Sequence, residues 1–226
     1  SYHTLYDTYA HFTRFRDPGL VYGVTLAELN GRATLRLANA PVLPFEFTNL
    51  ADHVADYLEE IEALTTTMRE ETARTNALLA SGAFALALDP QDTLGPPEAE
   101  AEVPYLNFAP LENAVARLEE SAAAWAAAEV DPEALDAATL ARLNRLLYTS
   151  ERVLTLEDGL PRRPWFRHHV YAPGFYTGYG VKTLPAVREA IEEREFDAVD
   201  TQVRRTAAVL EAMAERIETI VALVEA

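Results

Sequence analysis

Apolar residues recur near the C-terminal end of the chain at alternating steps of four and three, which is the spacing of a heptad seam. The positions are Val199, Val203, Thr206, Leu210, Met213, Ile217, Ile220 and Val224, with Thr206 as the one polar member. This pattern predicts a helix with an apolar stripe, which is stable only when another helix covers the stripe. From the spacing alone, the covering helix belongs either to a bundle within this chain or to a second copy, and the first arrangement is the more common.

A second one-sided stripe predicts a long helix in the first half of the chain. Its members are Leu50, Val54, Tyr57, Leu58, Ile61, Leu64 and Met68. Thr48 or Asn49 is expected to cap its start, because their side-chain oxygens can accept backbone N–H groups. The helix is expected to continue to Leu79 and to stop at Ser81-Gly82.

Three further helices are predicted from caps, prolines and apolar spacing. One begins at Asp17-Pro18 and ends before Pro41, another covers residues 111–130, and a third runs from Asp131-Pro132 to about residue 154. Residues 89–110 carry frequent prolines and acidic residues, so we expect an exposed segment without helix there. The fold class is therefore mainly α.

Composition excludes several classes of function. The chain has 226 residues, which suits one large domain or one domain with a fragment of another. Its formal net charge of −17 disfavours nucleic acid and anionic membrane surfaces as partners. The absence of Cys excludes disulfides, thiolate zinc sites and cysteine nucleophiles, and no apolar run is long enough to span a membrane.

One window reverses the overall charge. Residues 159–188 contain no Asp or Glu, and their basic residues are Arg162, Arg163, Arg167, Lys182 and Arg188. The same window is rich in proline, glycine and aromatic residues, so it is predicted to be an irregular loop. Its cations either dock the loop onto carbonyls and helix ends or bind a small anion such as a carboxylate.

The first 16 residues are too aromatic and too short to fold alone, so they require a partner surface. Five histidines are present in the chain, and no pair has the helical i, i+4 spacing with an intervening Glu that is typical of zinc peptidases. The residues alone therefore do not assemble a complete metal site.

Two motifs carry a resemblance to a known family. Residues 1–8, Ser-Tyr-His-Thr-Leu-Tyr-Asp-Thr, resemble the last metal-ligand motif of the glutamate carboxypeptidase II and transferrin receptor family of zinc peptidases. Residues 159–168, Gly-Leu-Pro-Arg-Arg-Pro-Trp-Phe-Arg-His, followed by Val-Tyr-Ala-Pro at 170–173 and by Tyr179, resemble its C-terminal signature. Shorter matches at residues 37–39 and 42–45 lie between them, and the resemblance is weakest across residues 85–130.

The resemblance implies the domain organisation. Residues 1–40 would be a C-terminal remnant of the α/β catalytic domain, and residues 41–226 would be a helical dimerisation domain, a four-helix-bundle-like structure with a long irregular loop. It also shifts the expectation for the heptad seam toward packing against a second copy. The implied partners are a second copy of the chain, the upstream catalytic domain and a peptide substrate, with no nucleic acid and no membrane within this chain.

The resemblance also implies roles for single residues. His3 would be a zinc ligand, and Tyr2 would be the catalytic phenol that stabilises the oxyanion. Tyr179 would bind a substrate carboxylate, with Arg167 and His168 as further substrate-binding residues. Zinc is expected in the full-length enzyme but not in this fragment, because the other ligands and the general base would lie upstream, and the chain by itself is expected to be inert.

One departure from the family pattern concerns specificity. The family member that prefers C-terminal glutamate has Lys directly before the tyrosine, whereas this chain has Gly178, so glutamate specificity is not carried over. Two alternatives to the peptidase hypothesis stay open. One is a non-catalytic, receptor-like domain that binds a protein, and the other is a stand-alone helical protein that binds small anions through the loop.

Overall fold

Helices dominate the computed structural model, which describes residues 2–87 and 95–225. The α-helices are α1 (Tyr9–His11), α2 (Val21–Ala38), α3 (Thr48–Ala80), α4 (Ala83–Ala87), α5 (Ala109–Ala127), α6 (Ala137–Tyr148), α7 (Pro185–Glu192) and α8 (Phe196–Glu225). Shorter helical turns are η1 (Phe12–Arg16), η2 (Pro18–Leu20) and η3 (Ser150–Leu154), and β1 (Tyr171–Pro173) pairs antiparallel with β2 (Val181–Thr183). The predicted mainly α fold class is confirmed.

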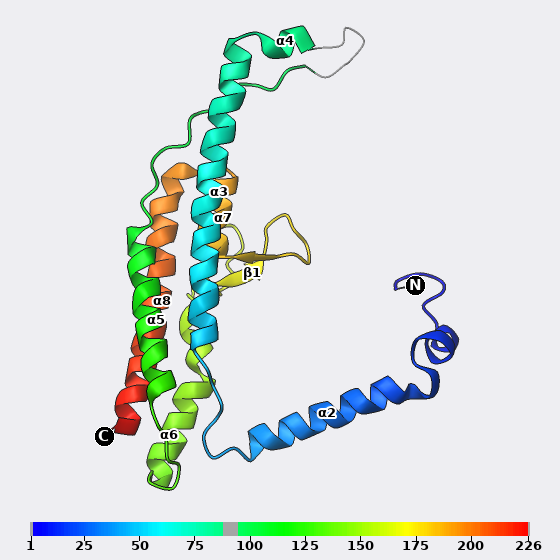
Figure 1. The fold of residues 1–226 in the computed structure, drawn as a ribbon, viewed down its shortest axis with the longest axis vertical. Helices are drawn as coiled ribbons and strands as arrows, with labels where there is room; N and C mark the ends of the chain where they lie inside the picture. Colours follow the sequence, from blue (N-terminus) through cyan, green and yellow to red (C-terminus); the bar gives the residue numbers. More distant parts are fainter. Residues whose placement is uncertain (1, 88–94, 226) are drawn as a thin grey trace.

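The heptad seam lies on α8 and is covered by the chain itself. α8 packs most extensively against α5, with α7, η3 and α6 on its other sides (Figure 1). Seven of the eight seam residues are buried, from Val199 to Ile220, and Val224 is half-buried. The expectation that a second copy covers this seam is therefore wrong, and the bundle within one chain is confirmed. A periodic stripe marks the face that a helix buries, but it does not identify the helix that covers it.

The predicted long helix is α3, which packs along α5 through Ala51, Val54, Leu58 and Ile61. It ends as expected, with Ser81 as its C-cap. Its start differs, since Phe47 occupies the N-cap position without a side-chain hydrogen bond. The apolar Phe47 ring is held there by burial in the core rather than by capping.

The segment 95–108 contains no helix, as predicted, but it is not simply exposed. It runs along the C-terminal half of α3 (Figure 1). There the side chain of Asn76 exchanges two hydrogen bonds with the backbone of Glu100, and Arg194 donates to the carbonyl of Ala101. Val103 and Phe108 are buried. Side chains from distant parts of the sequence thus hold the backbone of this segment in place. The rest of the predicted exposed stretch, residues 89–94, lies outside the described residues.

Two helix boundaries differ from the predictions. α6 begins at Ala137 rather than at residue 132, because the carboxylate of Asp136 caps it by accepting the N–H of Thr139 at 2.7 Å. α7 was not predicted separately, and it is divided from α8 by Arg194, whose φ of 59° reverses the chain direction. This break turns α7 back onto the side of α8.

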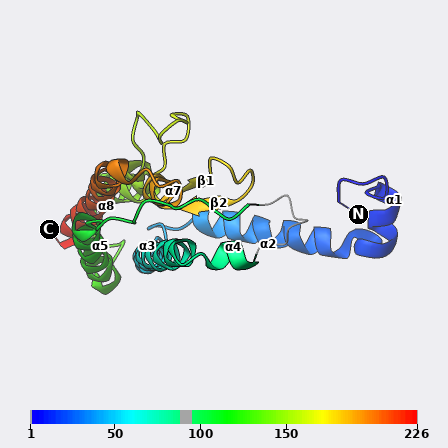
Figure 2. The ribbon, with the colours of Figure 1, turned by 90° about the horizontal axis from the view of Figure 1, so that it is seen from above.

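Residues 2–39 form an arm that lies apart from the bundle (Figures 1 and 2). The predicted cap at Asp17 is present, since its carboxylate accepts the N–H groups of Tyr22 and Gly23. No residue of α2 is buried, and Leu26, Leu29 and Leu35 are exposed. The arm therefore lacks the covering surface that its apolar residues require. None of the described helices combines the length and the apolar character needed to cross a membrane.

Candidate functional site

Most of the window without acidic residues forms an irregular loop between η3 and α7. We call residues 159–184 the 159–184 loop. Its backbone runs through a tight turn at residues 160–166 and then through the β1–β2 hairpin, whose tip is residues 174–180. Gly159 has φ of +65°, and a Cβ there would lie 2.3 Å from the carbonyl oxygen of Pro164, so only glycine fits. The tip is closed by Thr177, whose hydroxyl donates to the carbonyl of Gly180 at 2.6 Å.

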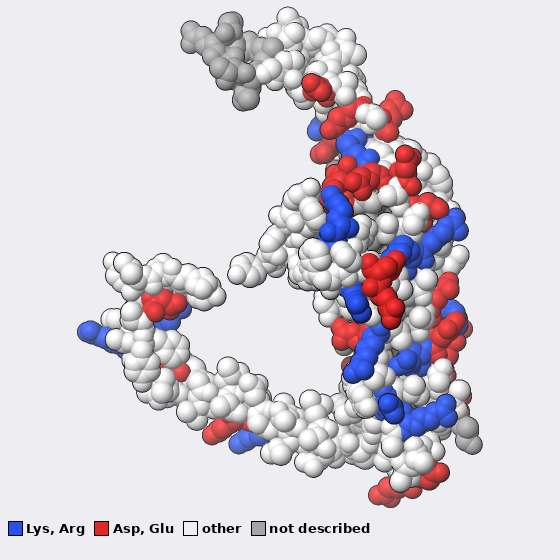
Figure 3. Space-filling model, turned by 180° about the vertical axis from the view of Figure 1, so that it is seen from behind, with Lys and Arg blue, Asp and Glu red and all other residues white. Residues whose placement is uncertain are grey.

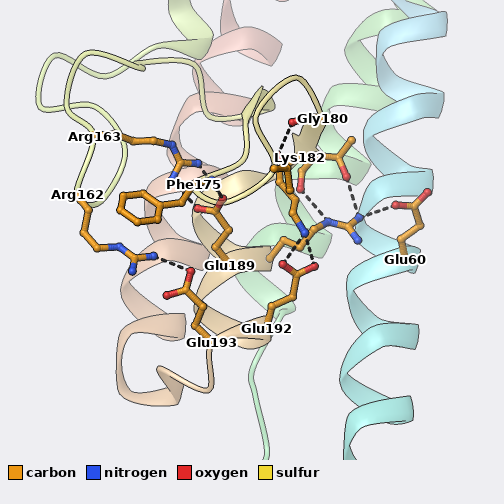
Figure 4. Close-up of polar contacts among 12 residues, drawn as sticks. Glu60, Arg162, Arg163, Phe175, Gly180, Lys182, Glu189, Glu192 and Glu193 are labelled. Carbon is orange, nitrogen blue, oxygen red and sulfur yellow. Dashed lines mark hydrogen bonds and ion pairs between the residues drawn. The ribbon is translucent and has the colours of Figure 1, made fainter.

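Glutamates of α3 and of α7 and its C-terminal end neutralise most cations of residues 159–188, which are those of the loop and Arg188 on α7 (Figure 4). Three of these acids lie on or beside α7 and one lies on α3. The pairs are Arg162 with Glu193 at 2.7 Å, Arg163 with Glu189 at 2.7 Å, Lys182 with Glu192 at 2.6 Å and Arg188 with Glu60 at 2.5 Å. For these four cations the docking alternative is confirmed. The local charge reversal serves mainly to hold the loop on the bundle.

The pair of Arg163 and Glu189 is buried, which distinguishes it from the others. Arg163 is 2% exposed and Glu189 is 7% exposed. Two guanidinium nitrogens donate to the two carboxylate oxygens at 2.7 and 3.0 Å, and the backbone N–H of Phe175 donates to the same carboxylate at 2.8 Å. The carboxylate of Glu189 thus joins the turn at residue 163 to the start of the hairpin tip.

Exposed aromatic rings surround the tip. Tyr179 is fully exposed, Tyr176 is largely exposed, and Phe175 packs edge-on against Tyr176. Gly178 has φ of +58° and open space around it, so a longer side chain would meet backbone strain rather than a clash. The backbone conformation at Gly178 therefore favours glycine, at the position where Lys was expected for glutamate specificity.

Arg167 and His168 lie below the tip and differ in their surroundings. Arg167 is exposed and forms no ion pair within the described ranges. His168 is half-buried, and its Nδ1 accepts the N–H groups of Val170 and Tyr171 at 3.2 Å each. Its Nε2 lies 3.6 Å from a carboxylate oxygen of Glu151, and burial lowers the pKa of the imidazole. The His168 ring therefore supports the local backbone, and its contact with a substrate stays a prediction.

Tyr2 and His3 are both exposed, in the arm. Their ring centroids are 3.9 Å apart, and the backbone N–H of His3 donates to Asp7 at 3.2 Å. Among residues 2–87 and 95–225, no three His, Asp or Glu side chains form a group that could hold a metal ion. His3 is exposed as a single potential ligand, and its zinc role stays a prediction.

The structure does not bring the two groups of predicted site residues into contact. The arm lies apart from the bundle, with open space between them (Figure 3). The hairpin projects from the bundle on the side where the N-terminal segment lies (Figure 1).

Sequence reasoning missed two buried residues of this region. Glu189 was not connected to the loop, although Glu189, Glu192 and Glu193 follow the acid-free window at helical spacing and were a usable signal. His169 is fully buried, and its ring nitrogens have no hydrogen-bond partner in the described part of the chain. Burial, with Arg205 nearby, lowers the pKa of His169 to about 4. No sequence signal separates it from the half-buried His168.

Comparison with known proteins agrees with this architecture. The family model of the transferrin receptor-like dimerisation domain matches residues 106–218, which is half of the chain. Probable glutamate carboxypeptidases of Arabidopsis thaliana, Arthroderma benhamiae and Zea mays are 27%, 26% and 24% identical to this chain over 84% of its length. The chain spans about a fifth of each relative's length, 22% in all three cases. This chain belongs to the transferrin receptor-like dimerisation domain family, as it occurs in glutamate carboxypeptidase-like proteins.

Proposed function

We propose that this chain is the homodimerisation domain of a dinuclear-zinc exopeptidase, and that its 159–184 loop forms one side of the substrate pocket in the complete enzyme. The family match supports self-association. The observation that carries the pocket role is Tyr179, whose phenol is fully exposed on a hairpin that ion pairs tie to the bundle. Exposed aromatic clusters on an anchored support are typical of interaction sites.

The loop offers two groups to a substrate carboxylate. The phenol of Tyr179 can donate a hydrogen bond, and the guanidinium of Arg167 can donate a charge-assisted pair. Arg167 suits this role because the other arginines of the loop window are already paired with glutamates. Gly178 adds no cation at the tip, so we assign no preference for C-terminal glutamate.

Zinc would be held in part by His3, since its imidazole is exposed in the arm beside Tyr2. When bound, such a metal polarises the scissile carbonyl and lowers the pKa of a bound water. The phenol of Tyr2 would donate a hydrogen bond to the developing oxyanion. The remaining ligands would come from the upstream domain, so the chain by itself is proposed to be inactive.

Sedimentation equilibrium over a wide concentration range tests the self-association. We expect the 226-residue chain to give a concentration-dependent dimer, and a strict monomer at high concentration would contradict the proposal. Because the seam of α8 is already covered, Leu210→Ala is expected to lower stability without removing the dimer selectively.

Hydrolysis assays test the peptidase role. The complete polypeptide is expected to release the C-terminal residue from N-acetyl dipeptides that end in Glu, Ala or Leu, and a chelator should stop the reaction. Tyr179→Phe should raise KM more than it lowers kcat, because it removes a binding contact. Chelator-sensitive hydrolysis by the isolated chain would overturn the proposed inactivity, and an inert, zinc-free complete polypeptide would favour the receptor-like alternative.

A further inference from the structure

The carboxylate of Glu189 has three hydrogen-bond donors from two separate parts of the loop (Figure 4). Two come from the Arg163 guanidinium and one from the backbone N–H of Phe175. A buried ion pair gains little net stability, because desolvation of both charges offsets most of their attraction. A stability role alone is therefore a weak explanation for placing this pair under the hairpin.

The bond to Phe175 connects the buried pair to the tip that carries Tyr179. Phe175 lies two residues after the end of β1, and Tyr179 lies four residues further along the tip. The ring of Phe175 is also clamped from the side by Arg162, whose Cζ lies 4.2 Å from the ring centroid and which itself pairs with Glu193. Thus one helix end holds both the backbone and the ring of Phe175.

The opposite strand of the hairpin is held from the same helix. Lys182 on β2 contacts both carboxylate oxygens of Glu192 at 2.6 and 2.7 Å. Lys182 thus ties β2 to α7, and Phe175 ties the start of the tip to the same helix, while the turn at the end of the tip is closed by bonds at Thr177 and Gly180. Among the three glutamates, only Glu189 is buried, so its pair with Arg163 is the best shielded from solvent and salt.

We propose that Glu189 is a positioning residue, which fixes the hairpin tip so that Tyr179 is presented to the substrate in a set orientation. This inference rests on the proposed pocket role of the loop. Arg163 orients the Glu189 carboxylate through two hydrogen bonds, and the bond from the Phe175 N–H to the same carboxylate holds the start of the tip in place. Glu189 itself does not touch the substrate.

Hydrogen exchange on the 226-residue chain tests the positioning directly. In Glu189→Gln the hydrogen-bonded amides of the tip, those of Gly174, Phe175 and Gly180, should exchange about tenfold faster or more, because a neutral amide oxygen accepts a weaker bond from Phe175 than the carboxylate does. Amides in the middle of α8 should keep their wild-type rates. A uniform increase over the whole chain would show a merely structural role and would overturn the proposal.

A double variant keeps the test decisive if Glu189→Gln folds poorly. Arg163→Met combined with Glu189→Leu replaces the buried charges with apolar side chains, which is often neutral for stability. The tie to Phe175 is absent, so the tip should still exchange faster while the melting temperature stays near that of the wild type. Unchanged tip exchange in this variant would refute the positioning role. The exposed pair of Arg117 and Glu218, replaced in the same way, is the matched control.

Kinetics of the complete polypeptide supply the functional readout, with N-acetyl dipeptides as the probe. The double variant should raise KM about tenfold with kcat within about twofold, because the loss is one of substrate binding. Adding Tyr179→Phe should have little further effect, since both changes remove the same contact. Full additivity would contradict the coupling. An inactive wild-type polypeptide would contradict the proposed function. The hydrogen-exchange result would still show whether Glu189 fixes the tip, because it does not depend on activity.

Discussion

Asn144 of α6 binds the segment that joins the arm to the bundle through both ends of its side-chain amide. The N–H of Leu43 donates to its Oδ1 at 2.9 Å, and its Nδ2 donates to the carbonyl of Pro41 at 2.8 Å. Leu43 and Pro41 lie 101 and 103 residues before Asn144 in the sequence. One side chain therefore fixes the point at which residues 2–39 leave the helical bundle.

Asn144→Ala should lower the free energy of unfolding by about 1–2 kcal/mol, because two hydrogen bonds to the backbone are lost at once. Asn113→Ala on α5 is the control, since Asn113 is exposed and undergoes the same change in helix propensity. Urea denaturation followed by far-UV circular dichroism measures both. Equal midpoints for the two variants would show that the Asn144 contacts contribute nothing.

Stability should fall as the pH drops from about 6.5 to 4, because His169 is buried and its folded-state pKa is about 4. In this window the unfolded state binds a proton that the folded state does not, so stability rises with pH and is fully present above the unfolded pKa. The shift corresponds to roughly 3 kcal/mol at most, at about 1.4 kcal/mol per pKa unit. Acidic residues add their own dependence at lower pH.

His169→Phe should flatten the pH dependence between 6.5 and 4, because no imidazole remains to be protonated on unfolding. Urea midpoints measured at half-unit steps of pH provide the comparison, and His53→Gln, at an exposed position, is the control for losing a histidine. A wild-type slope in His169→Phe would assign the effect to other groups.

Gly159→Ala should destabilise the chain by about 3 kcal/mol or more, because the added Cβ would overlap the backbone of Pro164 in addition to the positive φ. Gly82→Ala has a similar φ of +73° but open space around it, so about 1 kcal/mol is expected from backbone strain alone. Thermal melting distinguishes the two costs. If both variants lost the same stability, the close contact at Pro164 would be irrelevant.

Thr206→Val should leave the stability unchanged or raise it by about 1 kcal/mol. The Thr206 hydroxyl is fully buried in the seam and has no hydrogen-bond partner among the described residues, so a methyl group of similar volume removes a polar group that gains nothing there. Thr201→Val, on the exposed face of α8, controls for β-branched propensity. A loss of several kcal/mol would show that the hydroxyl has a partner after all.

The helices could be read from the sequence where an apolar stripe or a cap was local. The stripe of α3, its end at Ser81 and the cap at Asp17 all depend on residues within a few positions of one another. The start of α6 was misplaced because both Asp131 and Asp136 can cap, and only the folded chain selects Asp136. Propensity does not choose between two adequate caps.

The window that starts at residue 159 forms the predicted loop as far as residue 184, and most of its cations pair with the protein's own glutamates. An excess of positive charge in a window of sequence favours an anion as ligand only if the protein's own acids are out of reach. Glu189, Glu192 and Glu193 lie within hydrogen-bond distance of the loop because α7 folds back beneath it. Of the substrate-binding residues expected in this loop, Arg167 and Tyr179 remain free to contact a ligand in the described structure.

By itself, the sequence determined the mainly helical class, the positions of the longest helices, the irregular loop and the motifs that carry the family resemblance, because these depend on short-range patterns. Tertiary structure alone decided that α5 covers the seam of α8, that glutamates form ion pairs with most of the loop's cations, and that the arm lies apart from the bundle. The physical reason is the same in each case. A periodic pattern states which face of an element must be buried or paired, whereas the identity of its partner depends on contacts between residues far apart in the chain.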